Sequence, residues 1–149
     1  MSIHFQIKVF DSLSLQELYQ IMVLRQEVFV VEQDCPYLDA DGKDEVSLHV
    51  VGYHDDRLVA YSRIVPKGIS YEKYASIGRV VTHPSVRGKG VGKLLMKQSI
   101  QACQKAFGNH IKIKISAQSH LTRFYDEFGF KTVGEGYLED GIPHIGMIL

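Results

Sequence analysis

The sequence has few cysteines, no long apolar run and no recognisable leader segment. Its two cysteines, Cys35 and Cys103, form no CxxC pair and show no metal-ligand spacing, which argues against a disulfide scaffold and a metal site. No apolar run reaches the roughly 18 residues that a membrane span needs. The first ten residues, MSIHFQIKVF, alternate in polarity and lack the continuous apolar region of a signal peptide. We therefore expect a cytoplasmic protein that binds neither a metal nor a membrane.

Acidic residues are absent from one continuous third of the chain. Residues 73–125 contain ten Lys or Arg and no Asp or Glu, so the remainder holds all 17 acids and 7 bases. Seven of the acids lie between Glu27 and Glu45. This split indicates either a molecule that meets an anion on one side and a cation on the other, or two oppositely charged solvated faces. Nucleic acid is not expected, because the basic stretch lacks interleaved aromatic residues.

Periodicity predicts one α/β domain over residues 1–149. We expect strands at 3–9, 48–53, 57–65, 74–83, 111–117, 130–138 and 143–149. Helices are expected from Ser14, which begins a capping box, to about Val31, from about Val91 until Gly108, and over roughly 119–128. Segment 32–45 has the composition of an acidic loop. A helical crossover joins strands 74–83 and 111–117, so these two strands are expected to be parallel in a mixed sheet.

A glycine-rich loop, VRGKGVGKLL at 86–95, lies between a predicted strand and a predicted helix. Unpaired N–H groups and the helix dipole favour an anion there. A Walker A loop is excluded because Lys93 is followed by Leu94, and a dinucleotide GxGxxG motif is excluded because position 93 is lysine. What remains is an R-x-x-G-x-G pattern, starting at Arg87, at the beginning of a helix.

This pattern resembles the acetyl-CoA loop of the GNAT N-acetyltransferases. The stretches IGRVVTHP before the loop and RFYDEFGFKTVGE (123–135) after it resemble neighbouring family motifs. LRQEVFVVEQDCPYLDADG (24–42), AQSHLTRFY (117–125) and EDGIPHIGM (139–147) resemble the ElaA-like branch. The resemblance spans nearly the whole chain. It implies a mixed, mostly antiparallel sheet with a splayed parallel pair and flanking helices, and acetyl-CoA as cosubstrate.

The resemblance also implies roles for particular residues. Main-chain groups of Val80, Val81 and Thr82 would pair with the pantetheine arm, and Tyr125 would lie beside the thioester sulfur as the candidate acid. The loop amides would hold the pyrophosphate, with Arg87 and Lys89 adding positive charge. The residues whose amides are implied are Gly88, Lys89, Gly90, Val91, Gly92 and Lys93.

The expected reaction is direct attack of a primary amine, from a small molecule or a peptide, in a ternary complex. Neither cysteine has a visible activating partner, so no acyl-enzyme is expected. The general base is left open among Glu27, Glu32, Asp39, Asp41, His49, His83 and His144. We favour Glu27 and His144 as catalytic residues.

Two alternatives remain open from the sequence. A non-catalytic acyl-CoA-binding sensor or regulatory module would keep the loop without the acid and base, and a structural domain would use the glycines only for a turn. An exposed edge strand makes a homodimer a further expectation.

Overall fold

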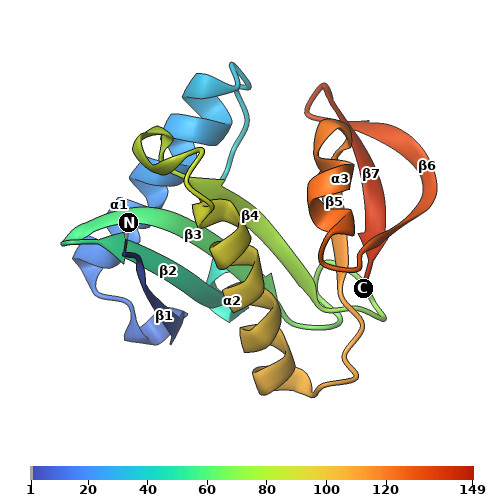
Figure 1. Cartoon of the computed structure of the whole chain (residues 1–149), viewed down its shortest axis with the longest axis horizontal. Helices are drawn as coiled ribbons and strands as arrows, with labels where there is room; N and C mark the ends of the chain where they lie inside the picture. The colour runs from blue at the N-terminus through green and yellow to red at the C-terminus, as the bar shows by residue number, and fades with distance from the viewer. Residues whose placement is uncertain (1) are drawn as a thin grey trace.

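The computed structural model describes residues 2–149 and contains two antiparallel sheets with helices around them (Figure 1). The strands are β1 (His4–Val9), β2 (Leu48–His54), β3 (Arg57–Val65), β4 (Ser76–Thr82), β5 (Lys114–Gln118), β6 (Lys131–Glu139) and β7 (Ile142–Ile148). The α-helices are α1 (Leu15–Arg25), α2 (Val91–Phe107) and α3 (Thr122–Asp126). A π-helical segment, η2 (Gln26–Glu32), continues from α1, and short 3-10 turns are η1 (Phe10–Ser12), η3 (Asp44–Val46), η4 (Pro84–Val86) and η5 (Ser119–Leu121).

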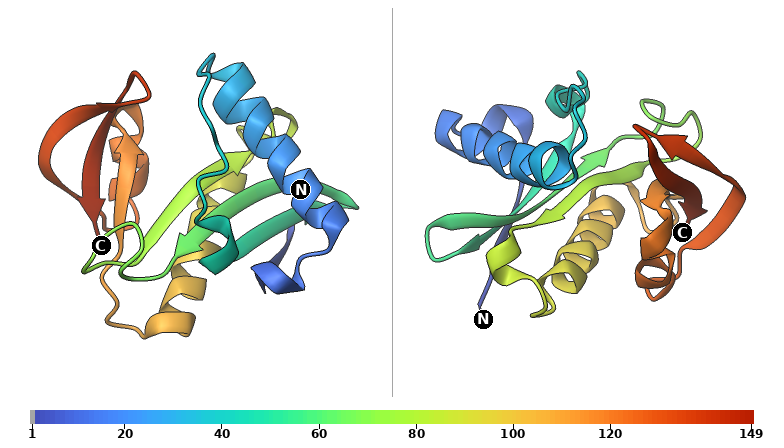
Figure 2. Two further views of the ribbon diagram at one scale, coloured as in Figure 1. Left: turned by 180° about the vertical axis from the view of Figure 1, so that it is seen from behind. Right: turned by 90° about the horizontal axis from the view of Figure 1, so that it is seen from above.

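The first sheet has the order β1-β2-β3-β4, and different helices cover its two faces (Figure 2, right). Side chains alternate along β2, so Val50 belongs to the core beneath α2 and Val51 to the core beneath α1 and η2. On β3, Ile64 likewise belongs to the core beneath α2, and Tyr61 belongs to the core beneath α1 and η2. Because both faces of β2 and β3 are covered, nearly every position of these strands is buried, and their sequences are almost continuously apolar.

The start of α1 is held by the predicted capping box. The Ser14 hydroxyl accepts from the Glu17 amide at 3.0 Å, and the Glu17 carboxylate accepts from the Ser14 amide at 3.0 Å. Glu17 also accepts from the Lys8 ammonium and the Tyr53 hydroxyl, each at 2.8 Å. One carboxylate therefore connects the helix to strands β1 and β2.

Strands β4 and β5 meet at one end and then separate. Ala75 forms a parallel bridge with Ile113, in which the Ala75 amide donates to Lys112 at 3.1 Å and the Lys114 amide donates to Ala75 at 2.9 Å. Beyond this bridge β5 pairs with β7, in a second sheet of order β5-β7-β6. The outer edge of β4 consequently has no partner strand within residues 2–149.

A bulge in β4 re-aims its side chains just where the strands separate. Gly78 opposes Arg63 and Val81 opposes Tyr61, so β4 uses one residue more than β3 over this interval. Arg79 at the bulge has φ +49°, a left-handed conformation that is costly for a residue with a side chain.

The sequence-based fold prediction is confirmed in class, in the order of elements and in the splayed parallel pair. Strand ends differ by a few residues. The helix expected to about Val31 changes from α to π geometry after Arg25, and the one expected over 119–128 is a 3-10 turn followed by the short α3. No helix of residues 2–149 is long and apolar enough to cross a membrane.

Candidate active site

A groove of about 1040 Å³ lies where β4 and β5 separate. Val80, Val81 and Thr82 of β4 line one side. Tyr125 of α3 and His144 of β7 line the opposite side, and η2 with the segment after it supplies a third wall. The structure therefore brings the predicted cofactor strand and two of the three favoured catalytic residues into one groove.

The glycine loop has the geometry of an anion site. Gly88 and Gly90 have φ of +76° and +79°, and a Cβ built on either would meet nothing within 4 Å. Gly90 is also the N-cap of α2 and has no side chain to cap it. The amides of Val91, Gly92 and Lys93 have no backbone acceptor within residues 2–149. Three free donors at the positive end of a helix, with open space before them, fit a pyrophosphate.

Arg87 is the first residue of the R-x-x-G-x-G pattern, and its side chain lines the groove. Its Nη1 lies 2.7 Å from the Glu32 carboxylate, and its Nε and Nη2 donate to the Thr82 carbonyl at 3.3 and 3.2 Å. The Lys89 ammonium donates to a carbonyl of η4 at 3.4 Å, and Lys93 pairs at 3.1 Å with a carboxylate that follows α3. The guanidinium therefore faces the groove, whereas both ammonium groups are bonded elsewhere.

Tyr125 is a buried tyrosine with an uncommitted hydroxyl. Its ring packs edge-to-face against Phe124 and Phe130, with centroid distances of 5.1 and 6.1 Å, and 8% of the residue is exposed. Burial raises the pKa of Tyr125 to about 12. Its hydroxyl therefore keeps its proton at neutral pH, and it donates to no other side chain in the described part of the chain.

His144 is held so that one ring nitrogen faces a carboxylate. Its Nδ1 lies 2.7 Å from the Ile142 carbonyl, which can only accept, so Nδ1 carries a proton and donates it. The neutral ring then has its lone pair on Nε2, 3.5 Å from the Glu139 carboxylate. His144 is buried and Glu139 is half exposed, and both line the groove.

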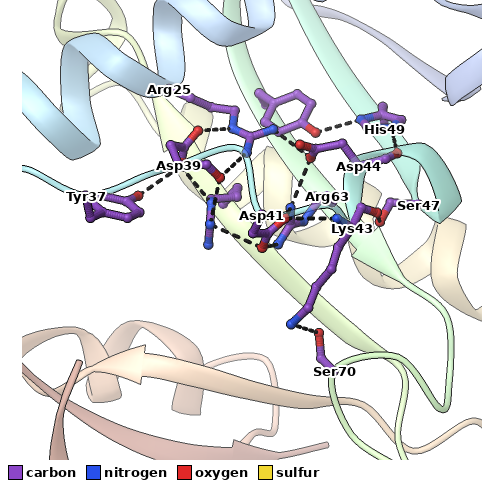
Figure 3. A network of polar contacts seen from close by, with 12 residues as sticks. Arg25, Tyr37, Asp39, Asp41, Lys43, Asp44, Ser47, His49, Arg63 and Ser70 are labelled. Carbon is purple, nitrogen blue, oxygen red and sulfur yellow. Dashed lines mark hydrogen bonds and ion pairs between the residues drawn. The ribbon is translucent and has the colours of Figure 1, made fainter. Parts of the chain in front are cut away.

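The acidic loop predicted at 32–45 is largely neutralised by arginines (Figure 3). The Asp39 carboxylate accepts from Arg25 at 2.6 Å and from Arg79 at 2.8 Å. Asp41 accepts a two-point bond from Arg63 at 2.7 and 2.8 Å. Burial opposes ionisation of Asp41, but the guanidinium bonds hold its pKa well below the usual range. These two carboxylates are therefore committed to arginines, which argues against either as the base.

Of the other base candidates, Glu32 lines the groove but is paired with Arg87 at 2.7 Å, whereas His49, Glu27 and His83 do not line it. His49 is fully enclosed, with Nδ1 2.6 Å from the Tyr61 hydroxyl and Nε2 2.8 Å from the Asp44 carbonyl. Glu27 is half exposed on η2, and its carboxylate lies 3.8 Å from His83. Neither member of that pair lines the groove. The structure thus brings His144 into the groove and leaves Glu27 outside it.

Glu139, the first residue of the EDGIPHIGM stretch, is not among the site residues predicted from the sequence. A two-residue Asp-Gly hairpin turn pairs Glu139 with Ile142, and it therefore pairs Tyr137 with His144. The turn residues have φ of +51° and +77°, as this turn type requires. Counting outward from the turn would have placed Glu139 near His144. Within residues 2–149 no three His, Cys, Asp or Glu side chains gather as metal ligands would.

Comparison with known proteins identifies similar chains over nearly the whole length. Residues 10–149 match the family model described as an acetyltransferase (GNAT) domain. The chain is 44% identical over 139 residues to Protein ElaA of Escherichia coli, covering 92% of this chain and 90% of that protein. The crystal structure of E. coli ElaA superposes with a TM-score of 0.92 at 41% identity, covering 99% of both chains.

Two further solved structures share the fold. An acyl-CoA N-acyltransferase from Pseudomonas aeruginosa is 42% identical with a TM-score of 0.93 and 99% coverage of both chains. An aminoglycoside 6'-N-acetyltransferase complexed with coenzyme A has a TM-score of 0.70 at 18% identity, with 97% of this chain and 96% of that chain covered, which is a likeness of fold alone.

Proposed function

The chain belongs to the GNAT acetyltransferase family, and from this premise we propose that it transfers the acetyl group of acetyl-CoA to a primary amine by direct attack in a ternary complex. The coarser activity, N-acyl transfer from an acyl-CoA, is what the family and the N-acyltransferase relatives support. The cosubstrate, the acceptor and the residue roles below are proposals. A cytoplasmic location and a homodimer stay predictions.

The observation that carries the proposal is the meeting of the open edge of β4 with Tyr125 in one groove. An extended ligand can add itself to such an edge through main-chain hydrogen bonds. The pantetheine arm has amide groups suited to this, and we assign it to Val80, Val81 and Thr82. We assign the pyrophosphate to the free amides at the start of α2, and Arg87 supplies positive charge beside them.

The cosubstrate supplies an acetyl group activated as a thioester. In the reaction the lone pair of a neutral amine forms a bond to the acetyl carbon, and the carbon–sulfur bond breaks with its electron pair on sulfur. One proton of the amine nitrogen is then lost to solvent, and the CoA thiolate takes up a proton from solvent to become the thiol. An alkyl amine has a pKa near 10.4 and is mostly protonated at neutral pH, so a base is needed. We assign that role to Nε2 of His144 rather than to Glu27, because Glu27 does not line the groove, and rather than to Glu32 or Asp41, because these are paired with arginines.

We assign the Tyr125 hydroxyl the role of hydrogen-bond donor to the leaving sulfur. With its pKa at about 12, it remains a donor at neutral pH. An ordinary thiol, with a pKa near 8.5, is the stronger acid, so complete proton transfer from Tyr125 to the thiolate is uphill. Its contribution is therefore a hydrogen bond that stabilises charge developing on sulfur.

Direct attack is preferred to an acyl-cysteine. Cys103 is fully buried, and burial raises the pKa of its thiol to about 11. Cys35 lines the groove, but its thiol donates to the Asp140 carbonyl at 3.4 Å and no base approaches it among residues 2–149. Mass spectrometry after acetyl-CoA treatment should find no acetyl group on either cysteine, and finding one that turns over would refute direct attack.

The test is calorimetric titration of acetyl-CoA and CoA into the wild type and an Arg87→Ala, Gly90→Asp double variant. We expect binding to disappear in the folded double variant, because a carboxylate would then face the pyrophosphate. Lys105→Ala, which removes a charge near the other end of α2, is the matched control and should bind normally. Release of CoA thiol with a panel of amines then tests catalysis.

Each outcome has a separate meaning. No binding by the folded wild type would overturn the proposal. Binding without thiol release for any amine would favour the non-catalytic acyl-CoA sensor.

A further inference from the structure

A chain of polar contacts ends at Glu139 on the groove side of the second sheet. The Tyr137 hydroxyl bonds to the Ser116 hydroxyl, which lies 3.3 Å from one Glu139 oxygen. The other Glu139 oxygen is the one 3.5 Å from Nε2 of His144. The ring of Tyr137 stacks on that of His144 at 6.2 Å and 20°. Strands β5, β6 and β7 thus each contribute to holding this carboxylate and imidazole in place.

In the neutral form of the ring, the two facing atoms of His144 and Glu139 are both acceptors. Since Nδ1 of His144 donates to the Ile142 carbonyl, the neutral ring presents a lone pair at Nε2. A lone pair and a carboxylate oxygen 3.5 Å apart lack a donor between them. His144 is more than nine-tenths buried and makes no hydrogen bond through Nε2 within residues 2–149. A group with several N–H donors would satisfy both atoms at once.

Charge on this side of the groove points to the same kind of group. Glu32 pairs with Arg87, and Asp41 pairs with Arg63. By contrast, Glu139 has no Lys or Arg partner within residues 2–149, and neither does the neighbouring Asp140. The edge of the groove formed by Glu139 and Asp140 is therefore negative. It should attract a cationic acceptor and repel an acceptor that carries a carboxylate.

We propose that Glu139 binds the ammonium group of the acceptor and presents it to His144, so that the acceptor is an amine without a neighbouring carboxylate, such as an alkyl diamine. This inference rests on the proposed acyltransferase function and names the substrate class of that site. One ammonium N–H donates to Glu139 and another to Nε2 of His144. The second proton moves to Nε2 and leaves the nitrogen lone pair free. The imidazolium that forms faces Glu139, which stabilises it.

The test compares two probes that differ only in a carboxylate, 1,5-diaminopentane and lysine. Their binding to the CoA-loaded protein is followed by the NMR shifts of the Ser116, Glu139 and His144 amides. We expect the diamine to shift these signals in the wild type. Lysine should need an at least about tenfold higher concentration to produce the same shifts. Glu139→Gln should abolish the response, and Glu139→Asp should restore part of it. Glu135→Gln, on the same strand and exposed, is the matched control and should behave as the wild type.

Where the diamine is acetylated, Glu139→Gln should raise its KM at least about tenfold and leave the CoA dissociation constant unchanged. Preference for lysine, no shifts in the wild type, or equal shifts in Glu139→Gln would each overturn the inference. These results differ from failure of the proposed function, which is read from CoA binding and thiol release alone.

Discussion

The carboxylate of Glu32 lies 2.7 Å from the guanidinium of Arg87, across the end of the groove beside the glycine loop. The same guanidinium donates to the main chain at the end of β4. Each partner is about two-fifths exposed, at 41% and 40% of its side chain. The residue assigned to the pyrophosphate is thus already bonded to an anion of the protein itself, and cosubstrate and carboxylate compete for it.

Removing that competitor should strengthen cosubstrate binding. Glu32→Gln frees Arg87 and removes a negative charge from the cosubstrate's path. An exposed pair contributes about 0.2–1 kcal/mol, so we expect the CoA dissociation constant to fall by up to about fivefold in calorimetry. Asp34→Asn, an exposed charge removed just after η2, is the control and should change little. Weaker binding in Glu32→Gln would mean that the carboxylate instead holds Arg87 in its binding position.

Removing the Tyr125 hydroxyl should slow turnover without loosening the fold. Tyr125→Phe should lower kcat by about a hundredfold, the scale of a lost donor at the leaving group. Because the hydroxyl bonds to no other side chain within residues 2–149, the melting temperature and the CoA affinity should stay close to wild type. Tyr19→Phe, on the exposed side of α1, is the control. An unchanged kcat would remove Tyr125 from the mechanism.

Asp39 should matter for stability far more than for chemistry. Arg25 is fully buried, and Asp39→Asn would leave its charge without the carboxylate 2.6 Å away. Removing one partner of a buried pair costs about 3–5 kcal/mol when the other charge is left unpaired. Arg25 keeps Asp44 at 2.7 Å, so the free energy of unfolding in urea should fall by less, about 1.5–3 kcal/mol. Asp34→Asn again serves as the control. A loss below about 1 kcal/mol would show that the remaining Arg25 bonds compensate.

Glu17 should make the contribution of α1 to stability depend on pH. Burial would raise its pKa, but the bonds from Lys8, Ser14 and Tyr53 outweigh it and lower the pKa from 4.5 to about 2. A lowered folded pKa stabilises the protein above the unfolded value and loses that effect as pH falls toward the folded value. The difference in urea midpoint between wild type and Glu17→Gln should therefore be complete at pH 7 and shrink from about pH 4.5 to 2. A difference that is constant over this range would exclude the carboxylate charge as its cause.

Local patterns determined much of this protein from the sequence alone. Alternating polarity located strands such as β1 and β5, and short apolar runs on either side of a turn located β2 and β3, because both patterns depend only on neighbouring residues. The Ser14 capping box and the glycine loop could be found because each depends only on residues a few positions apart. The Asp-Gly turn likewise sets, from adjacent residues, the register that places Tyr137 opposite His144.

Tertiary structure decided which charged groups are available. Asp39 and Asp41 look like free acids in the sequence, and their arginine partners lie between 14 and 40 positions away. These partners lie on α1, β3 and the bulge of β4, and the separation of β4 from β5 beyond Ala75 leaves room for the groove. Only the folded chain therefore separates His144, which lines the groove, from Glu27, which lies outside it, because electrostatic contacts depend on distance in space and not on distance along the chain.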